Sequence, residues 1–173
     1  MSLSGKKILF VTAPQNFRDE EYFEPKEILS GQGAEIVTAS LVTGDITGAK
    51  GGKAKSDVII NNVKAVDYEG IVFVGGPGAQ VFWNNPSAQK IAQDAASQGK
   101  VLGAICMGPG TLLKAGVLKG KNATAFMSLQ GDFSAAGANY TGKAVEQDGK
   151  IITANGPEAA RDFGNALLVE LSK

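Results

Sequence analysis

The single cysteine of the chain, Cys106, lies where a short apolar run ends and a segment that favours a helix begins. Small residues lie two positions to either side, Ala104 and Gly108, where a large side chain would block a sharp reversal of the chain. This pattern is typical of a nucleophile elbow, in which the sulfur points toward the N-terminus of the following helix. The N–H groups and dipole of that helix would favour a thiolate. The alternative is a small buried hydrophobe at the end of a strand, which is a common setting for a free cysteine.

A second turn that could take part in chemistry is Gly-Gly-Pro-Gly at residues 75–78, directly after the apolar run 71–74. Such a turn can aim backbone N–H groups into the space in front of Cys106. Together with the N–H of Met107 they would form an oxyanion hole or an anion nest. The alternative is a plain tight turn. The spacing does not fit the dinucleotide fingerprint G-x-G-x-x-G, and the chain has no P-loop.

The third candidate is the charged segment Arg18-Asp19-Glu20-Glu21. Acidic residues are favoured in the first turn of any helix by the helix dipole alone. A carboxylate here therefore has a chemical role only if it reaches the thiol.

Composition excludes several kinds of site. The chain of 173 residues has no histidine, so Ser-His-Asp and Cys-His catalysis and His-ligated metal sites cannot be built from it. We expect no metal and no cofactor. One cysteine allows no internal disulfide, which fits the cytoplasm. Seventeen basic residues balance seventeen acidic ones, and no apolar run is long enough to span a membrane, so neither nucleic acid nor membrane is an expected partner. The first five residues lack the pattern of a signal peptide.

The elements that must position these residues alternate along the chain. Apolar runs predict strands at residues 8–11, 34–39, 71–74, 101–105 and 122–126. Helices are predicted up to Ser30 and at residues 86–99, 109–118 and 157–173. This alternation indicates one α/β domain over residues 1–173, a mostly parallel sheet with helices on both faces. Ligands of such sheets gather beyond the carboxyl ends of the strands, here after Val11, Val74 and Ile105.

Two further segments are predicted to be antiparallel. Residues 143–145 and 151–153, joined through Asp148-Gly149, give a strong hairpin signal, and residues 44–60 resemble a hairpin or an excursion at the sheet edge. The loops at residues 80–85 and 131–139 are expected to shape the pocket. Phe82-Trp83 is interpreted as an apolar surface feature that a symmetric dimer would bury.

Four segments together resemble the ThiJ/PfpI family, and within it the intracellular protease I branch. They are A-I-C-M-G-P at 104–109, G-G-P-G at 75–78, D-Y-E-G-I-V-F-V from Asp67, and D-G-K-I-I-T-A-N-G-P at 148–157. The resemblance implies a flavodoxin-like three-layer sandwich, a homodimer or higher homo-oligomer, and a nucleophilic Cys106. It also implies that a glutamate of the first helix, four residues before a proline, contacts that cysteine.

The residue of this chain that has the required spacing is Glu21, which precedes Pro25 by four positions. The oxyanion donors implied by the resemblance are the backbone N–H groups of Gly76 and Met107. Three positions depart from the family pattern. Met107 replaces a histidine found in peptidase-type members, Arg18 replaces a second acid, and Asn155 replaces an arginine.

These residues support one leading function and three alternatives. Glyoxalase or deglycase chemistry on a small aldehyde or a glycated substrate needs a thiolate and one carboxyl group, which Cys106 and Glu21 supply. The alternatives are a thiol redox sensor or chaperone-like dimer without catalysis, an intracellular cysteine peptidase or amidase, and an inactive scaffold. Peptidase activity is disfavoured because Met107 cannot act as a base. We expect a protonated Glu21 to lower the pKa of Cys106 below the value of about 8.5 of a free cysteine.

Overall fold

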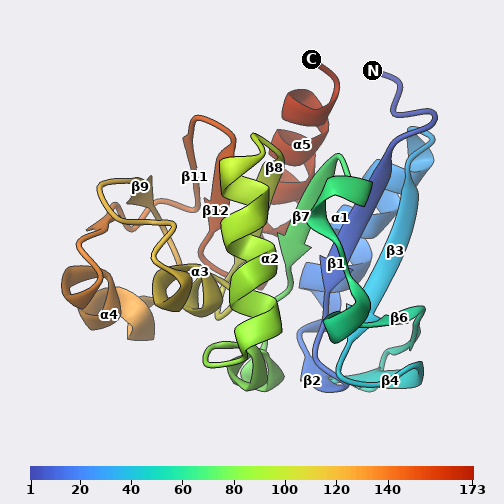
Figure 1. Ribbon diagram of the computed structural model, residues 1–173, viewed down its shortest axis with the longest axis horizontal. Coiled ribbons are helices and arrows are strands. Elements are labelled where there is room, and N and C mark those ends of the chain that lie inside the picture. Colours follow the sequence, from blue (N-terminus) through green and yellow to red (C-terminus); the bar gives the residue numbers. More distant parts are fainter.

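The computed structural model describes all residues from 1 to 173, and its centre is a seven-stranded sheet (Figure 1). The strand order is β11-β12-β8-β7-β1-β3-β6. Every strand from β6 to β12 in this order is parallel to its neighbour, and only β11 runs antiparallel. The strands are β1 (Lys7–Val11), β3 (Glu35–Ser40), β6 (Val58–Ile59), β7 (Gly70–Phe73), β8 (Val101–Ile105), β11 (Val145–Asp148) and β12 (Ile151–Ala154).

Helices cover both faces of this sheet, so the molecule has three layers (Figure 1). The helices α1 (Asp19–Gly31) and α5 (Ala160–Leu171) pack on one face, and α2 (Pro86–Ser97) and α3 (Pro109–Ala115) pack on the other. Successive strand residues point to opposite faces, as in β1, where Ile8 joins the core under α1 and α5 and Leu9 joins the core under α2. The predicted fold class, a mostly parallel sheet between helical layers, is confirmed.

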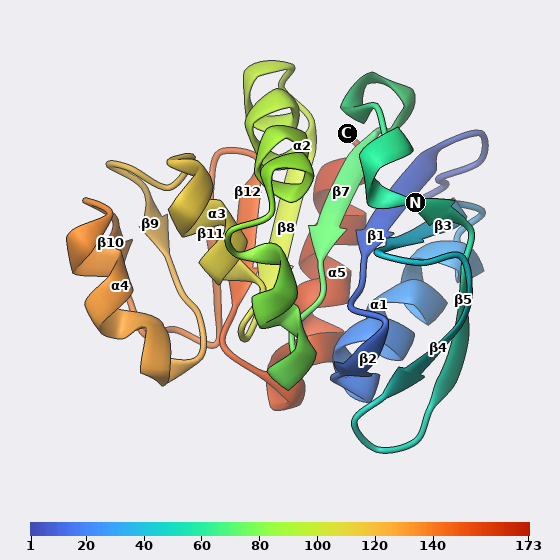
Figure 2. The same cartoon turned by 60° about the horizontal axis from the view of Figure 1, so that its bottom comes forward.

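Two smaller sheets lie at the margins of the molecule (Figure 2). One contains β2 (Gln15–Phe17), β4 (Gly44–Gly48) and β5 (Lys53–Ser56), and the other pairs β9 (Asn122–Ala123) with β10 (Asn139–Tyr140). The hairpins β4–β5 and β11–β12 are antiparallel, as predicted. Short 3-10 helices complete the chain: η1 (Ile60–Asn62), η2 (Ala65–Asp67), η3 (Pro77–Phe82), η4 (Met127–Leu129) and η5 (Pro157–Ala159).

Several predicted boundaries are wrong. The helix expected at 109–118 ends at Ala115, because Gly116 takes a left-handed conformation with φ of +81°. The strand expected at 122–126 keeps only its first two residues. The expected loop at 131–139 contains most of α4 (Gln130–Ala135), whose Phe133 is buried in the core. No helix of the structure is both long enough and apolar enough to cross a membrane.

Candidate active site

The backbone around Cys106 has the geometry of a nucleophile elbow. Cys106 follows β8 with φ of +62°, a conformation that is strained for a residue with a side chain. Its N–H donates to the carbonyl of Ala154 at 2.9 Å, and its carbonyl accepts from the N–H of Phe126 at 2.9 Å. A methyl group at Gly108 would lie 2.3 Å from the carbonyl oxygen of Phe73, so only glycine fits there. The neighbouring chain therefore holds the strained residue in place.

The Glu21 side chain lies in the first turn of α1, is fully buried and reaches the cysteine. Gly75 marks the place where the two side chains meet. A methyl group at Gly75 would lie 2.4 Å from Oε1 of Glu21 and 2.8 Å from Cβ of Cys106. Neither carboxyl oxygen of Glu21 has a well-formed hydrogen bond with another nitrogen or oxygen of the protein. The groups that face the carboxyl are the Cys106 thiol and the N–H of Gly75.

The glycine turn after β7 is crossed closely by the segment that leads into α1. The N–H of Arg18 donates to the carbonyl of Gly75 at 3.0 Å. A methyl group at Gly76, where φ is +102°, would lie 2.3 Å from that same nitrogen, and one at Gly78 would lie 2.0 Å from the carbonyl oxygen of Gln15. The glycines thus let two backbones touch, and this contact sets the start of α1 and the position of Glu21.

A carboxylate next to Glu21 ties the β4–β5 hairpin to the start of α1. The Asp19 carboxylate accepts hydrogen bonds from the N–H groups of Lys50 at 2.8 Å and Gly52 at 2.7 Å. Glycine at 52 is required, because a methyl group there would lie 2.4 Å from the Asp19 carboxylate. Asp19 is therefore a structural residue in this arrangement, and of the three acids only Glu21 faces the thiol.

The N–H groups of Gly76 and Met107 both face the Cys106 sulfur and lower the pKa of its thiol. Met107 is held from behind by Trp83, whose indole Nε1–H donates to the Met107 carbonyl at 3.0 Å. The expectation of Phe82-Trp83 as an apolar surface feature is wrong: Phe82 is only 2% exposed and Trp83 is half-buried. Both aromatic rings pack inward and support the site.

The titration of the pair differs from the sequence expectation. Burial raises the pKa of the Glu21 carboxyl to about 8, while the nearby thiol and the Arg18 charge lower it by smaller amounts. Burial, followed by repulsion from an ionised Glu21, raises the pKa of the Cys106 thiol to about 12. The expected pKa below that of a free cysteine is therefore not found. The two groups form a coupled pair that gives up its first proton near pH 8.

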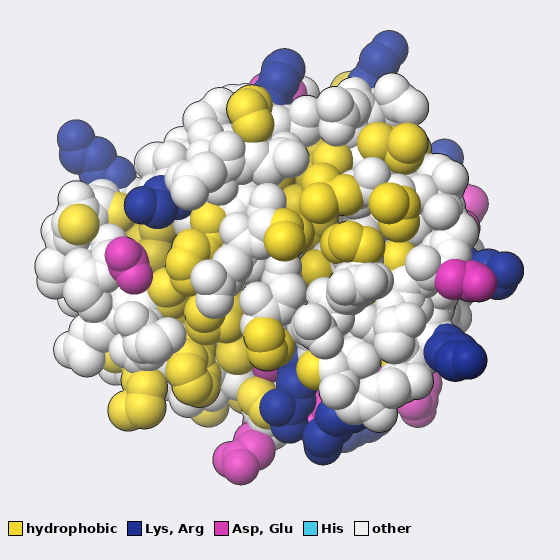
Figure 3. Space-filling view, turned by 90° about the horizontal axis from the view of Figure 1, so that it is seen from below, with side chains coloured by type: hydrophobic (Ala, Val, Ile, Leu, Met, Phe, Trp, Pro, Cys, Tyr) yellow, Lys and Arg dark blue, Asp and Glu magenta, His cyan; other side chains and the backbone are white.

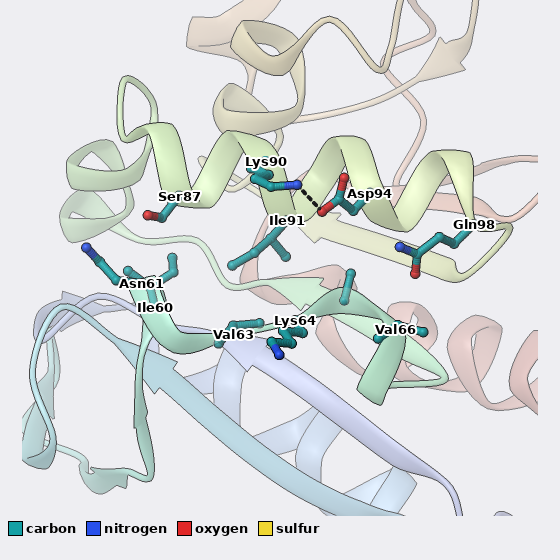
Figure 4. A pocket seen from close by; sticks show the side chains of 11 residues that line it. Ile60, Asn61, Val63, Lys64, Val66, Ser87, Lys90, Ile91, Asp94 and Gln98 are labelled. Carbon is teal, nitrogen blue, oxygen red and sulfur yellow. Dashed lines mark hydrogen bonds and ion pairs between the residues drawn. The ribbon is translucent and has the colours of Figure 1, made fainter.

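A groove of about 460 Å³ opens beside the elbow, on the face seen in Figure 3. It is lined by Phe126, whose N–H donates to the Cys106 carbonyl. It is also lined by Asn155, the next residue in the chain after Ala154, whose carbonyl accepts from the Cys106 N–H. A second pocket of about 320 Å³ lies between α2 and residues 60–66, where Lys90 pairs with Asp94 (Figure 4). Cys106 and Glu21 line neither of these two cavities. No group of three or more acidic or cysteine side chains is placed to hold a metal ion.

The structure brings together all four residues predicted from the sequence: Cys106, Glu21, Gly76 and Met107. Sequence reasoning missed the individual role of Gly75, whose lack of a side chain makes room for the side chains of both Glu21 and Cys106. It also missed Trp83 as the support of Met107. Two signals could have pointed to them: the doubled glycine of the turn, and the only tryptophan of the chain lying just after that turn.

Comparison with known proteins assigns the class of this fold and site. Residues 6–170 match the DJ-1/PfpI family, and the chain belongs to that family. The chain is 33% identical to the deglycase PfpI of Pyrococcus furiosus over 87% of this chain and 90% of that protein. It is 31% identical to YraA of Bacillus subtilis, named as a candidate cysteine protease, over 95% and 97% of the two chains. A crystal structure of a ThiJ/PfpI domain protein from Brachyspira murdochii aligns with a TM-score of 0.93 at 33% identity, covering 96% of each chain.

Proposed function

We propose that this protein converts small aldehydes, of the glyoxalase or deglycase kind, with Cys106 as nucleophile and Glu21 as the proton carrier. The observation that carries the proposal is the fully buried Glu21 carboxyl, which faces the Cys106 thiol and makes no hydrogen bond elsewhere in the protein. A carboxyl with a pKa of about 8 is able both to give and to take a proton near neutral pH. The deglycase name of a relative in the same family supports this reading.

The chemistry can be written with every atom accounted for. When the pair has lost one proton, the sulfur attacks the aldehyde carbon of a 2-oxoaldehyde while the Glu21 carboxyl gives its proton to the aldehyde oxygen. This forms a hemithioacetal and leaves a Glu21 carboxylate. The carboxylate then takes the proton from the former aldehyde carbon and returns it to the adjacent carbon. The hydroxyl proton on the former aldehyde oxygen moves to the oxygen of that adjacent carbon, which produces a 2-hydroxy thioester. Water hydrolyses the thioester, releasing a 2-hydroxy acid and the free thiol.

The backbone of the site supplies the remaining requirement. An oxygen on the carbon bound to sulfur develops negative charge as the sulfur attacks the aldehyde and again during thioester hydrolysis. The N–H groups of Gly76 and Met107, which face the sulfur, are placed to stabilise that charge. Fixed backbone donors need no reorganisation as the charge develops, so the glycine turn and the elbow both contribute to the rate.

The test is the formation of lactate from methylglyoxal by the purified protein. Cys106→Ser and Glu21→Gln are both expected to lower the rate to background, since one removes the nucleophile and the other the proton carrier. Glu27→Gln, at an exposed position of the same helix, is the matched control and is expected to retain full activity. No lactate from the unmodified protein, or equal activity in Glu21→Gln, contradicts the proposal. Casein hydrolysis that disappears in Cys106→Ser would instead favour a peptidase.

We further propose that the chain acts as a homodimer. The support is a band of apolar side chains across the face that carries the groove (Figure 3). Phe126 and Met127, which line the groove, are 42% and 72% exposed, and Val81 of η3 is 47% exposed. Large apolar side chains gathered on one face are typical of a surface that a partner covers.

A further inference from the structure

We propose that Arg18 binds a carboxylate of the substrate, so that the site prefers aldehydes that carry a carboxylate over neutral aldehydes. This inference rests on the proposed role of Cys106 as the reacting group. It goes further by naming the substrate class and the residue that selects it. Arg18 and Arg161 are the only arginines of the chain.

The backbone places Arg18 next to Gly75, the residue that contacts both Cys106 and Glu21. Its N–H donates to the carbonyl of Gly75, the residue packed against both Glu21 and Cys106. Its own carbonyl accepts from the N–H of Glu21 at 3.1 Å at the start of α1. The Arg18 charge lowers the pKa of Glu21, and the negative charges of ionised Glu21 and Cys106 in turn help to raise the pKa of Arg18.

The Arg18 side chain is held in place by one ion pair, but not all of its N–H groups have a hydrogen-bond partner. Its Nε and Nη2 atoms donate to the Glu20 carboxylate at 3.0 to 3.3 Å, and the side chain is 33% exposed. A guanidinium has about five N–H donors in a rigid fork, of which this pairing uses only two. The others remain free for a second carboxylate, the group whose geometry a guanidinium fits best.

The acidic residues near Arg18 are paired or protonated, so they do not strongly repel an anionic substrate. Glu20 is shared between Arg18 and Lys50, whose Nζ lies 3.5 Å from the same carboxylate. The other acid of this turn, Asp19, accepts from backbone N–H groups of the β4–β5 hairpin. Glu21 keeps its proton below about pH 8 and therefore does not repel an incoming carboxylate at neutral pH.

The test compares two reagents of nearly equal size that alkylate the only cysteine: iodoacetate, which carries a carboxylate, and iodoacetamide, which is neutral. The ratio of their rates at pH 7 cancels the fraction of thiolate and reports only how the site treats the carboxylate. Arg18→Gln is expected to lower this ratio by about three- to tenfold, because it removes one positive charge near the bound carboxylate. Arg161→Gln, an exposed arginine of α5, is the matched control and is expected to leave the ratio unchanged.

Glu20→Gln is expected to have the opposite effect and to raise the ratio of the iodoacetate rate to the iodoacetamide rate, because it frees the Arg18 guanidinium from its carboxylate partner. An unchanged ratio in both Arg18→Gln and Glu20→Gln, or an equal fall in Arg161→Gln, overturns the proposal. If Arg18→Gln does not fold, Arg18→Lys and Glu20→Gln still decide the question. Alkylation needs no aldehyde turnover, so a failure of the proposed function leaves this measurement intact: lactate formation would be absent while the ratio still responded to Arg18.

Discussion

At the scale of single residues, Cys106 and Glu21 titrate as a coupled pair. The carboxyl is fully buried and the thiol is 7% exposed, so water stabilises neither charge. Each group is the main polar neighbour of the other. The charge that the pair carries is therefore distributed between sulfur and oxygen according to the N–H groups around them, with Gly76 and Met107 on the side of the sulfur and Gly75 on the side of the carboxyl.

This coupling predicts the pH dependence of cysteine alkylation. In the unmodified protein the iodoacetamide rate is expected to rise first near pH 8, where the pair loses its first proton, and again toward pH 12. Glu21→Gln removes the carboxylate that opposes thiolate formation but keeps the burial and the N–H donors. We therefore expect a single step between these two values, measured by mass spectrometry of Cys106 across the pH range. A midpoint well below pH 8 in either protein would show that burial does not control the thiol.

At the scale of elements, close contacts made possible by glycine hold the layers at the distances the site needs. The strand β8, which ends in Cys106, passes under α5 at Gly103. A methyl group there would lie 2.9 Å from Cδ2 of Leu167 and 3.0 Å from Cζ of Phe163. Both side chains are fully buried, so they have little freedom to move aside.

Gly103→Ala is accordingly expected to lower the free energy of unfolding by about 1–3 kcal/mol, the usual cost of overpacking a core. Urea unfolding followed by circular dichroism measures this change. Gly131→Ala in α4 is the matched control, since no atom lies within 4 Å of the added methyl group. Alanine is favoured over glycine in a helix by up to about 1 kcal/mol, so this variant should be neutral or slightly more stable. Equal destabilisation by both variants would argue against the packing explanation.

At the scale of the whole molecule, the apolar groove face predicts self-association. Light scattering at micromolar concentration is expected to give about twice the chain mass of 17.8 kDa. Met127→Ser together with Phe126→Ser should shift the protein toward the monomer, because both side chains are exposed in the isolated chain. Val169→Ser, at an exposed position of α5, serves as the control. A monomer mass for the unmodified protein would contradict the homodimer.

The sequence by itself determined the alternation of strands and helices, the elbow at Cys106 and the glycine turn after β7. These features are local, because apolar runs, helix stops and small residues around one cysteine each depend only on neighbours within a few positions of the chain. Glu21 was identified as the partner of the thiol only through the family resemblance, which requires a glutamate four residues before a proline. Nothing in the helix pattern itself distinguishes Glu21 from Asp19 and Glu20.

Only the tertiary structure decided how those local features act together. The strand β2 forms through pairing with β4, about thirty residues away, so its Gln-Asn-Phe sequence carried no strand signal. The helix α4 contains a glycine and is stabilised by burial of Phe133, which local propensity does not show. The direction of the Cys106 pKa shift was decided in the same way. An exposed helix N-terminus would lower it, but here burial of the sulfur, which is set by the packing of the whole chain around it, has the larger effect.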